Sequence, residues 1–181
     1  MKKQRQWIRP ATIFVLCLLL SLAPVLAGCA QASLAKDLMA GVAAADWPEN
    51  PAEPDARFKG SYAGFAWDFF RESVLNEGNV LVSPASVFFA LTIALNGADT
   101  ETKAAMLDVL AAQGLSADEL NAACRDWSTL LSRTSQKTKL SISNSIWYRQ
   151  EFNPDPGFLQ KNADYFNAAA KSLDFSQQSA V

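Results

Sequence analysis

From residue 58 onward, hydrophobic and polar positions follow patterns that predict helices interspersed with short strands. Aromatic and aliphatic residues recur at helical spacing over 58–75, with charged residues offset from them, which predicts an amphipathic helix. A polar turn over 76–79 is expected to end this helix. The next three residues, Val80, Leu81 and Val82, have the composition of a short buried strand.

The second predicted helix covers 85–96. Ser83 can accept hydrogen bonds from its free amides, and Pro84 suits its first position. Because the helix is apolar nearly all round, we expect it to lie in the core rather than at the surface. Gly97 is expected to end it by adopting the left-handed conformation.

Two more helices are predicted before residue 134. The first begins near Thr100, ends around Gly114 and directs three residues inward: Met106, Leu107 and Leu110. The second begins at Ser116, which forms a capping-box pattern with Glu119, and reaches about Arg133.

The C-terminal third predicts a strand, a helix and a strand. Residues 140–148 alternate between apolar and polar, which is typical of a strand. Asn144 falls on the apolar face of this strand, where its amide must find hydrogen-bond partners. A helix is predicted over 154–169, followed by a strand over 171–175.

Cys124 lies within the fourth predicted helix. Its neighbours Leu120, Trp127 and Leu131 share its helical face. This arrangement favours a buried structural cysteine over a reactive thiol.

The first 29 residues have the layout of an export signal. A basic stretch precedes an apolar run over 11–22, which is shorter than a comfortable membrane span. The residues that follow this run resemble the lipobox of bacterial lipoproteins: Leu26, Ala27, Gly28 and Cys29. The small residues would let a signal peptidase approach the backbone, and the Cys29 thiol would carry the lipid. The interpretation is an exported lipoprotein, anchored in a cell-envelope membrane and facing away from the cytoplasm. An ordinary cleaved signal with an accidental cysteine is the alternative.

Composition divides the chain into three parts. Residues 1–28 are the predicted lipoprotein signal peptide. Residues 29–57 are rich in alanine, proline and acidic residues, which predicts an extended and poorly ordered tether. Residues 58–181 form the predicted folded part.

Charge and residue content exclude several classes of function. The chain has 16 basic and 18 acidic residues, and the first 28 residues carry four basic and no acidic ones. The remainder is therefore acidic, which argues against a nucleic-acid partner. The chain has no histidine, so histidine-based nucleophile activation is excluded and a catalytic zinc site is disfavoured. We expect no bound metal and no cofactor.

Several motifs resemble the serpin family of serine protease inhibitors. The segment Asn79-Val-Leu-Val-Ser-Pro-Ala-Ser-Val-Phe-Phe-Ala-Leu91, followed by Asn96-Gly-Ala98 and Thr102, is similar to the family's Asn-x-x-x-Ser-Pro-x-Ser pattern and the residues after it. Ser143-Asn-Ser-Ile-Trp147 is similar to a family strand that usually begins with alanine. The resemblance covers about 58–175. It implies an α+β fold: the N-terminal part of a serpin domain, with a helix cluster packed on the first strands of a large mixed sheet.

The resemblance also implies a function. Serpins inhibit serine or cysteine proteases through a reactive-centre loop that is cleaved and then inserts as a new strand into the main sheet. Asn79, Ser83, Ser86 and Asn144 match a polar cluster beneath that sheet, called the shutter, which governs strand opening. A purely structural interpretation is also open. In it Ser83 and Ser86 cap a helix, Asn79 ends a turn, and Asn144 is a buried amide with its hydrogen bonds satisfied.

The family's reactive-centre loop lies near the C-terminus of a much longer domain, and no segment here resembles it. We therefore expect a truncated inhibitor scaffold that lacks the loop. The alternative is a non-inhibitory cell-surface lipoprotein of serpin ancestry. An enzyme built around Ser83 is disfavoured, because the serine opens a core helix and is followed directly by proline.

Overall fold

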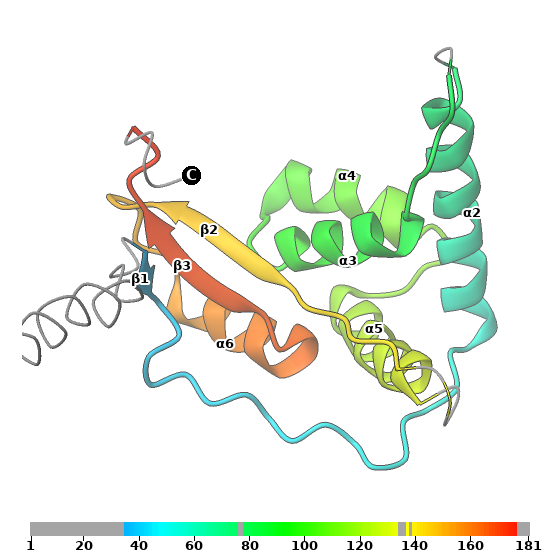
Figure 1. The fold of residues 1–181 in the computed structure, drawn as a ribbon. Helices are drawn as coiled ribbons and strands as arrows, with labels where there is room; N and C mark the ends of the chain where they lie inside the picture. Colours follow the sequence, from blue (N-terminus) through cyan, green and yellow to red (C-terminus); the bar gives the residue numbers. More distant parts are fainter. Residues whose placement is uncertain (1–34, 76–77, 134–136, 138, 177–181) are drawn as a thin grey trace, which may run out of the picture. The chain divides into compact units, whose positions relative to one another are not determined.

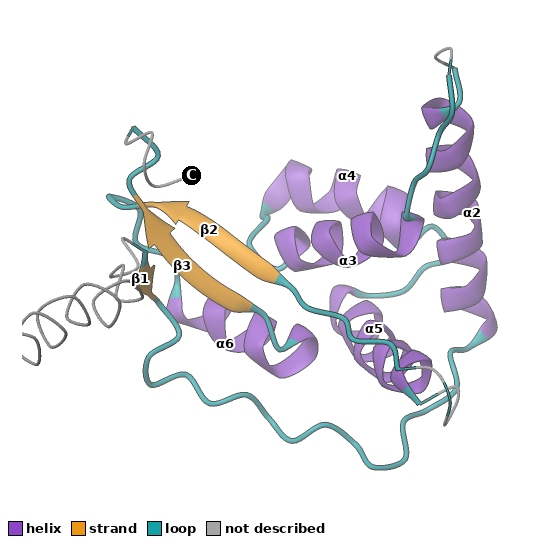
Figure 2. Cartoon of the chain, viewed as in Figure 1, coloured by secondary structure: helices purple, strands orange, loops and turns teal. Residues whose placement is uncertain are grey.

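The computed structural model describes residues 35–75, 78–133, 137 and 139–176. Their helices and strands appear in Figures 1 and 2. In chain order these are β1 (Lys36–Asp37), α2 (Ala56–Ser73), α3 (Pro84–Leu95), α4 (Thr100–Leu110), α5 (Ala117–Ser132), β2 (Ser145–Arg149), α6 (Pro156–Phe166) and β3 (Ala169–Leu173).

The three strands form one mixed sheet in the order β1-β3-β2. Strands β2 and β3 run parallel, with Ser145 opposite Ala169, and α6 is the crossover between them. Strand β1 pairs antiparallel with the other edge of β3, with Lys36 opposite Ser172. The middle strand is therefore the last of the described strands in chain order.

Aromatic side chains form the centre of the helical core. Phe88 of α3 is fully buried, and its ring lies 5.9 Å from that of Phe58, 5.4 Å from Tyr62 and 5.2 Å from Phe65. These three residues come from one face of α2, as the predicted amphipathic helix requires. Trp127 of α5 contacts the same group. Edge-to-face packing of this kind adds to the free energy gained from burial alone.

The helix caps form as their sequences predict. Ser83 accepts from the amide of Ser86 at the start of α3. At the start of α5, Ser116 and Glu119 form a capping box with both reciprocal hydrogen bonds. Cys124 is buried and free, which confirms the structural cysteine.

Helix α3 lies in the core along one face, as expected of a core helix, but another part of its surface is exposed. Its buried residues are Phe88, Phe89, Thr92, Ile93 and Leu95. Leu91 and its neighbours Ala90 and Ala94 are exposed. Helices α2, α4, α5 and α6 contact α3, and Ala90 and Ala94 line a hollow that β2 borders on its other side.

The prediction of a strand at 80–82 was wrong. These residues have no strand assignment, and the side chain of Leu81 is 99% exposed. A strand forms only where a neighbouring strand accepts its hydrogen bonds. Among the described residues, none pairs with this segment.

The prediction that Gly97 ends α3 in the left-handed conformation was also wrong. The glycines with positive φ in the described ranges are Gly41, Gly78 and Gly114. A Cβ on Gly97 would lie 2.8 Å from the Phe158 ring. Glycine is required there by the close approach of α6, not by the backbone angle.

Two boundaries near the C-terminus differ from the predicted ones. Helix α6 ends at Phe166, because Asn167 adopts a left-handed conformation with φ of 46°. Strand β3 consequently starts at Ala169, two residues earlier than predicted. The strand predicted over 140–148 is regular only from Ser145.

Residues 36–54, which we name the N-terminal strap, make hydrogen bonds with β3, α6 and α5. Figure 1 shows the strap running from β1 past α6 and α5 to the start of α2. Composition predicts an extended, poorly ordered tether over 29–57. The strap is extended but docked, because its backbone groups find partners on the folded part.

Candidate functional site

The candidate site lies where α3 begins beside the start of β2. The Ser83 and Ser86 hydroxyl oxygens are 2.8 Å apart, and the Ser86 amide donates to the Ser83 hydroxyl over 3.4 Å. Both serines are exposed in the described part of the chain. Their hydroxyls remain able to make further hydrogen bonds, because each has a donor and two acceptor positions.

Asn144, immediately before β2, joins three elements. Its side-chain amide donates to the carbonyl oxygen of Phe166 over 3.3 Å, at the last residue of α6. Its backbone carbonyl accepts from the amide of Ala169, the first residue of β3, over 3.0 Å. The polar residue on the apolar face of the predicted strand thus finds the partners that its burial requires.

Ser83, Ser86 and Asn144 line one hollow of about 550 Å³. Its other walls include Phe89 of α3 and Leu131 of α5. The structure therefore brings together three of the four residues that the resemblance assigns to a polar cluster. The fourth, Asn79, is exposed and is not among the lining residues.

A second, more apolar hollow of about 590 Å³ lies further along α3 and is bordered by β2. Asn144 and Ser145 line both hollows, so the start of β2 separates them. Tyr148 also lines the second hollow, and its hydroxyl is buried without a hydrogen-bond partner among the described residues. Burial raises the pKa of Tyr148, so its hydroxyl stays protonated and can donate.

A cluster of three amides behind the site was missed in the sequence. The Asn96 amide donates to the side-chain oxygens of Asn162 over 2.9 Å and of Asn121 over 3.2 Å. The Asn121 amide donates back to Asn96 over 2.7 Å. Asn121 and Asn162 are 0% and 1% exposed, so the cluster joins α3, α5 and α6 inside the core. The signal available in the sequence was an asparagine at a position where a helix is otherwise apolar. Asn144 gave the same kind of signal on its predicted strand.

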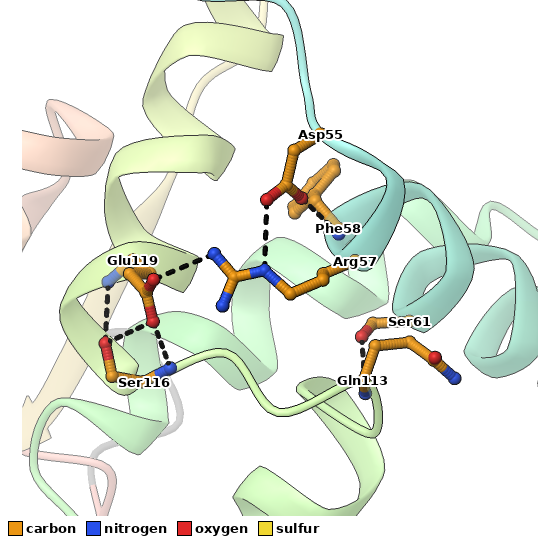
Figure 3. A network of polar contacts seen from close by, with 7 residues as sticks. All are labelled: Asp55, Arg57, Phe58, Ser61, Gln113, Ser116 and Glu119. Carbon is orange, nitrogen blue, oxygen red and sulfur yellow. Dashed lines mark hydrogen bonds and ion pairs between the residues drawn. The ribbon is translucent and has the colours of Figure 1, made fainter.

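A second polar network ties α2 to α5 (Figure 3). Arg57 donates to Asp55 over 3.1 Å and to Glu119 over 2.9 Å. Glu119 also accepts from the amide of Ser116 over 2.8 Å. Hydrogen bonds from Ser116 and Arg57 lower the pKa of Glu119 to about 2. Arg57 therefore links the cap of α2, through Asp55, to the capping box of α5, through Glu119.

The lipobox residues Leu26, Ala27, Gly28 and Cys29 lie outside the described residues. Within the ranges that the structure describes, no helix is long and apolar enough to span a membrane. In the same ranges no group of acidic or cysteine side chains is arranged to hold a metal ion.

The serpin (serine protease inhibitor) family model matches residues 61–181, two-thirds of the chain. The chain belongs to the serpin family. Its fold is the N-terminal part of the serpin fold, an incomplete α+β domain. Serpins are protease inhibitors and not enzymes.

Curated relatives match over part of their length. Mouse neuroserpin is 31% identical over 103 residues, which are 57% of this chain and 25% of that protein. Human serpin I2 is 24% identical over 117 residues, 64% of this chain and 29% of that protein. The serpin chain described here thus spans about a quarter of the length of the curated relatives it matches.

Solved serpin structures agree with this family and fold. The native state of tengpin, a thermophilic serpin, is 34% identical with a TM-score of 0.67, covering 81% of this chain and 37% of tengpin. An Arabidopsis serpin in its native stressed conformation is 25% identical with a TM-score of 0.56, covering 71% of this chain and 34% of that serpin.

Proposed function

We propose that residues 58–175 are scaffold for a serpin-type inhibitor of serine or cysteine proteases. The observation that carries the proposal is the position of Ser83, Ser86 and Asn144 around one hollow, where α3 begins beside β2. Inhibition of this type requires a sheet whose strands can separate. We propose that Asn144 and both serines break their present hydrogen bonds and form new ones during that separation.

The hydrogen bonds of Asn144 support the proposal. They link the start of β2 to the end of α6 and to the start of β3. A movement of β2 away from α6 would break the bond from Asn144 to the Phe166 carbonyl. The nearby Ser83 and Ser86 hydroxyls line the same hollow and can offer new partners.

The reactive-centre loop of the proposed inhibitor would come from residues outside this quarter of a serpin-length domain. Inhibition is therefore proposed for the whole gene product. The test is incubation with a trypsin-like and a subtilisin-like protease, followed by boiling and a denaturing gel. We expect a boiling-resistant band of protease and inhibitor from the whole gene product and none from residues 1–181 alone.

Either opposite result is informative. No such band from the whole gene product would contradict the inhibitory role and favour a non-inhibitory lipoprotein of serpin ancestry. A band from residues 1–181 alone would contradict the assignment of the loop to residues outside them.

We also propose that the protein is exported and anchored in a cell-envelope membrane through lipid on Cys29. The support is the order of basic stretch, apolar run and Leu26-Ala27-Gly28-Cys29. In a bacterial host given labelled palmitate, we expect label on the wild-type protein and on Cys17→Ser, and none on Cys29→Ser. Label that persists on Cys29→Ser would contradict the assignment.

A further inference from the structure

The N-terminal strap, residues 36–54, precedes the part of the chain that the serpin model matches. Its first contact is with the sheet. Strand β1 pairs antiparallel with β3, and the Leu38 amide donates to the Ala170 carbonyl over 2.9 Å. These bonds cover the edge of β3 that faces away from β2. An uncovered strand edge would present unpaired backbone groups to any other strand.

The middle of the strap is bonded to α6. Asp164 receives two contacts: the Ala45 amide donates to its carboxylate over 2.8 Å, and the Trp47 indole donates to its backbone carbonyl over 2.9 Å. One turn earlier on α6, Gln160 donates to the Ala43 carbonyl over 2.8 Å and to the Asp164 carboxylate over the same distance. Gln160 and Asp164, one turn apart on α6, thus bond to each other and to the backbone of the strap.

The last part of the strap is bonded to α5. The Ala52 amide donates to one carboxylate oxygen of Asp126 over 3.2 Å, and Arg125 donates to the other oxygen over 2.8 Å. Asp126 is only 8% exposed. Arg133, just after α5, donates to the Glu49 carbonyl. Residues more than 70 positions apart in the chain are therefore joined at every stage of the strap.

We propose that the strap is a clasp that holds α6 between β3 and α5. A passive linker would leave its backbone groups to water. Here the strap's hydrogen bonds reach β3, α6 and α5 in succession, and its end leads directly into the N-cap of α2 at Asp55. A domain lacking the strap would keep α6 through its packing alone, with β3 as an open edge.

The clasp also bears on the candidate site. Helix α6 ends at Phe166, whose carbonyl accepts the hydrogen bond from Asn144. Undocking the strap would leave α6 held by its packing alone, and we expect the bond from Asn144 to loosen as a result. The strap residues themselves do not line the hollow, so their role is to position α6 and β3.

Amide hydrogen–deuterium exchange on the whole chain tests the clasp. In the wild-type protein we expect the bonded amides of Leu38, Ala45 and Ala52 to exchange at least tenfold more slowly than in an unfolded peptide. Exchange at the unfolded rate would overturn the proposal, because the strap would then not be docked.

Variants separate a clasp from a docked but passive segment. Leu38→Pro removes the amide donor to Ala170, and Leu38→Ala keeps it. We expect at least tenfold faster exchange in β3 and α6 for the proline variant, with less than threefold change for the alanine variant. Equal exchange in the two variants would overturn the clasp.

A second pair covers the case in which Leu38→Pro does not fold. Asp164→Ala removes the acceptor for the Ala45 amide, and Glu151→Ala removes a charge from an exposed turn. Faster exchange in the strap and in β3 is expected only for Asp164→Ala. A wild-type rate in β3 for Asp164→Ala, with the strap released, would show that the strap does not hold the sheet.

Discussion

At the scale of single residues, Gly97 marks a close approach between the end of α3 and α6. It follows α3 and lies against the Phe158 ring of α6, where no side chain fits. At Cys124 the surrounding core does accommodate a side chain, which is fully buried. Both residues owe their identity to the space around them rather than to their backbone angles.

Gly97→Ala is expected to destabilise the fold. The added Cβ would lie 2.8 and 2.9 Å from two atoms of the Phe158 ring, so the ring or the helix must shift. Overpacking of this kind costs roughly 1–3 kcal/mol. The matched control is Gly64→Ala in α2, where a Cβ meets nothing within 4 Å. The control is expected to stabilise by about 0.5–1 kcal/mol. Urea unfolding measures both, and equal stability of Gly97→Ala and wild type would contradict the clash.

Cys124 is expected to be inert to thiol reagents. Burial raises the pKa of the Cys124 thiol to about 12, so almost no thiolate is present near neutral pH. In a chain with Cys17 and Cys29 replaced by serine, we expect no labelling by iodoacetamide at pH 8 under native conditions and full labelling in denaturant. Mass spectrometry reads out both states. Rapid native labelling would show that the core around α5 opens readily.

At the scale of elements, polar contacts join the helices in addition to the aromatic core. The Asn96, Asn121 and Asn162 cluster joins α3, α5 and α6, while Arg57 and Glu119 join α2 and α5. The side-chain nitrogen of Asn162 is buried without a partner among the described residues. Apolar packing tolerates small shifts, whereas hydrogen bonds between buried amides require particular distances and angles. The clusters therefore specify the helix arrangement.

Asn96→Ala is expected to cost about 1–3 kcal/mol for each buried group that it leaves unpaired. Asn121 and Asn162 both bond to Asn96 and lie almost fully inside the core. The matched control is Asn79→Ala, at an exposed position, where a change within about 0.5 kcal/mol is expected. Urea unfolding compares the two. An equal effect at both positions would argue against a structural amide cluster.

The stability that the Arg57–Glu119 contact gives to the packing of α2 against α5 is expected to decrease at acidic pH. The Ser116 amide, followed by Arg57, lowers the pKa of Glu119 from an ordinary value of 4.5 to about 2. A depressed pKa means that the contribution to stability is present above pH 4.5 and is lost as the pH falls from about 4.5 to 2.

NMR titration of the Glu119 carboxyl measures this directly. The midpoint should lie near pH 2 in the wild type. Arg57→Ala should raise it while leaving it below 4.5, because the Ser116 amide still donates. Lys59→Ala removes an equal charge from the same helix, but from a residue other than the Arg57 that bonds to Glu119, and should leave the midpoint in place. An unchanged midpoint in Arg57→Ala would contradict the network.

At the scale of the whole molecule, apolar groups remain uncovered. The side chain of Leu81 is 99% exposed, that of Leu75 is 71% exposed and that of Trp67 is 64% exposed. One face of α3 is exposed as well. Among the described residues, no strand pairs with the edge of β2 that faces away from β3. Surfaces of this kind drive association in water.

We therefore expect residues 30–181, produced without the signal, to self-associate at micromolar concentration. Sedimentation velocity measures the species present. Leu81→Asn should lower the associated fraction, and Ala112→Ser, at an exposed position of small apolar area, should not. A sharp monomer peak for the wild type at tens of micromolar would contradict the expectation.

Much of the helical structure was predictable because its signals are local. The Ser83 cap, the Ser116–Glu119 capping box and the apolar spacing of α2 each act within a few residues. The same locality explains the burial of Cys124, whose apolar neighbours share its helical face, whereas only the folded chain brings Asn144 to the hollow that Ser83 and Ser86 line.

The sequence alone determined the order of the helices, their caps, the buried cysteine and the family. Only the tertiary structure decided that residues 80–82 form no strand, that Gly97 serves a close approach, and that the strap is docked on β3, α6 and α5. The physical reason is distance along the chain. Caps and helical periodicity are settled by neighbouring residues, whereas strand pairing, helix approach and strap docking depend on partners that only the folded chain brings together.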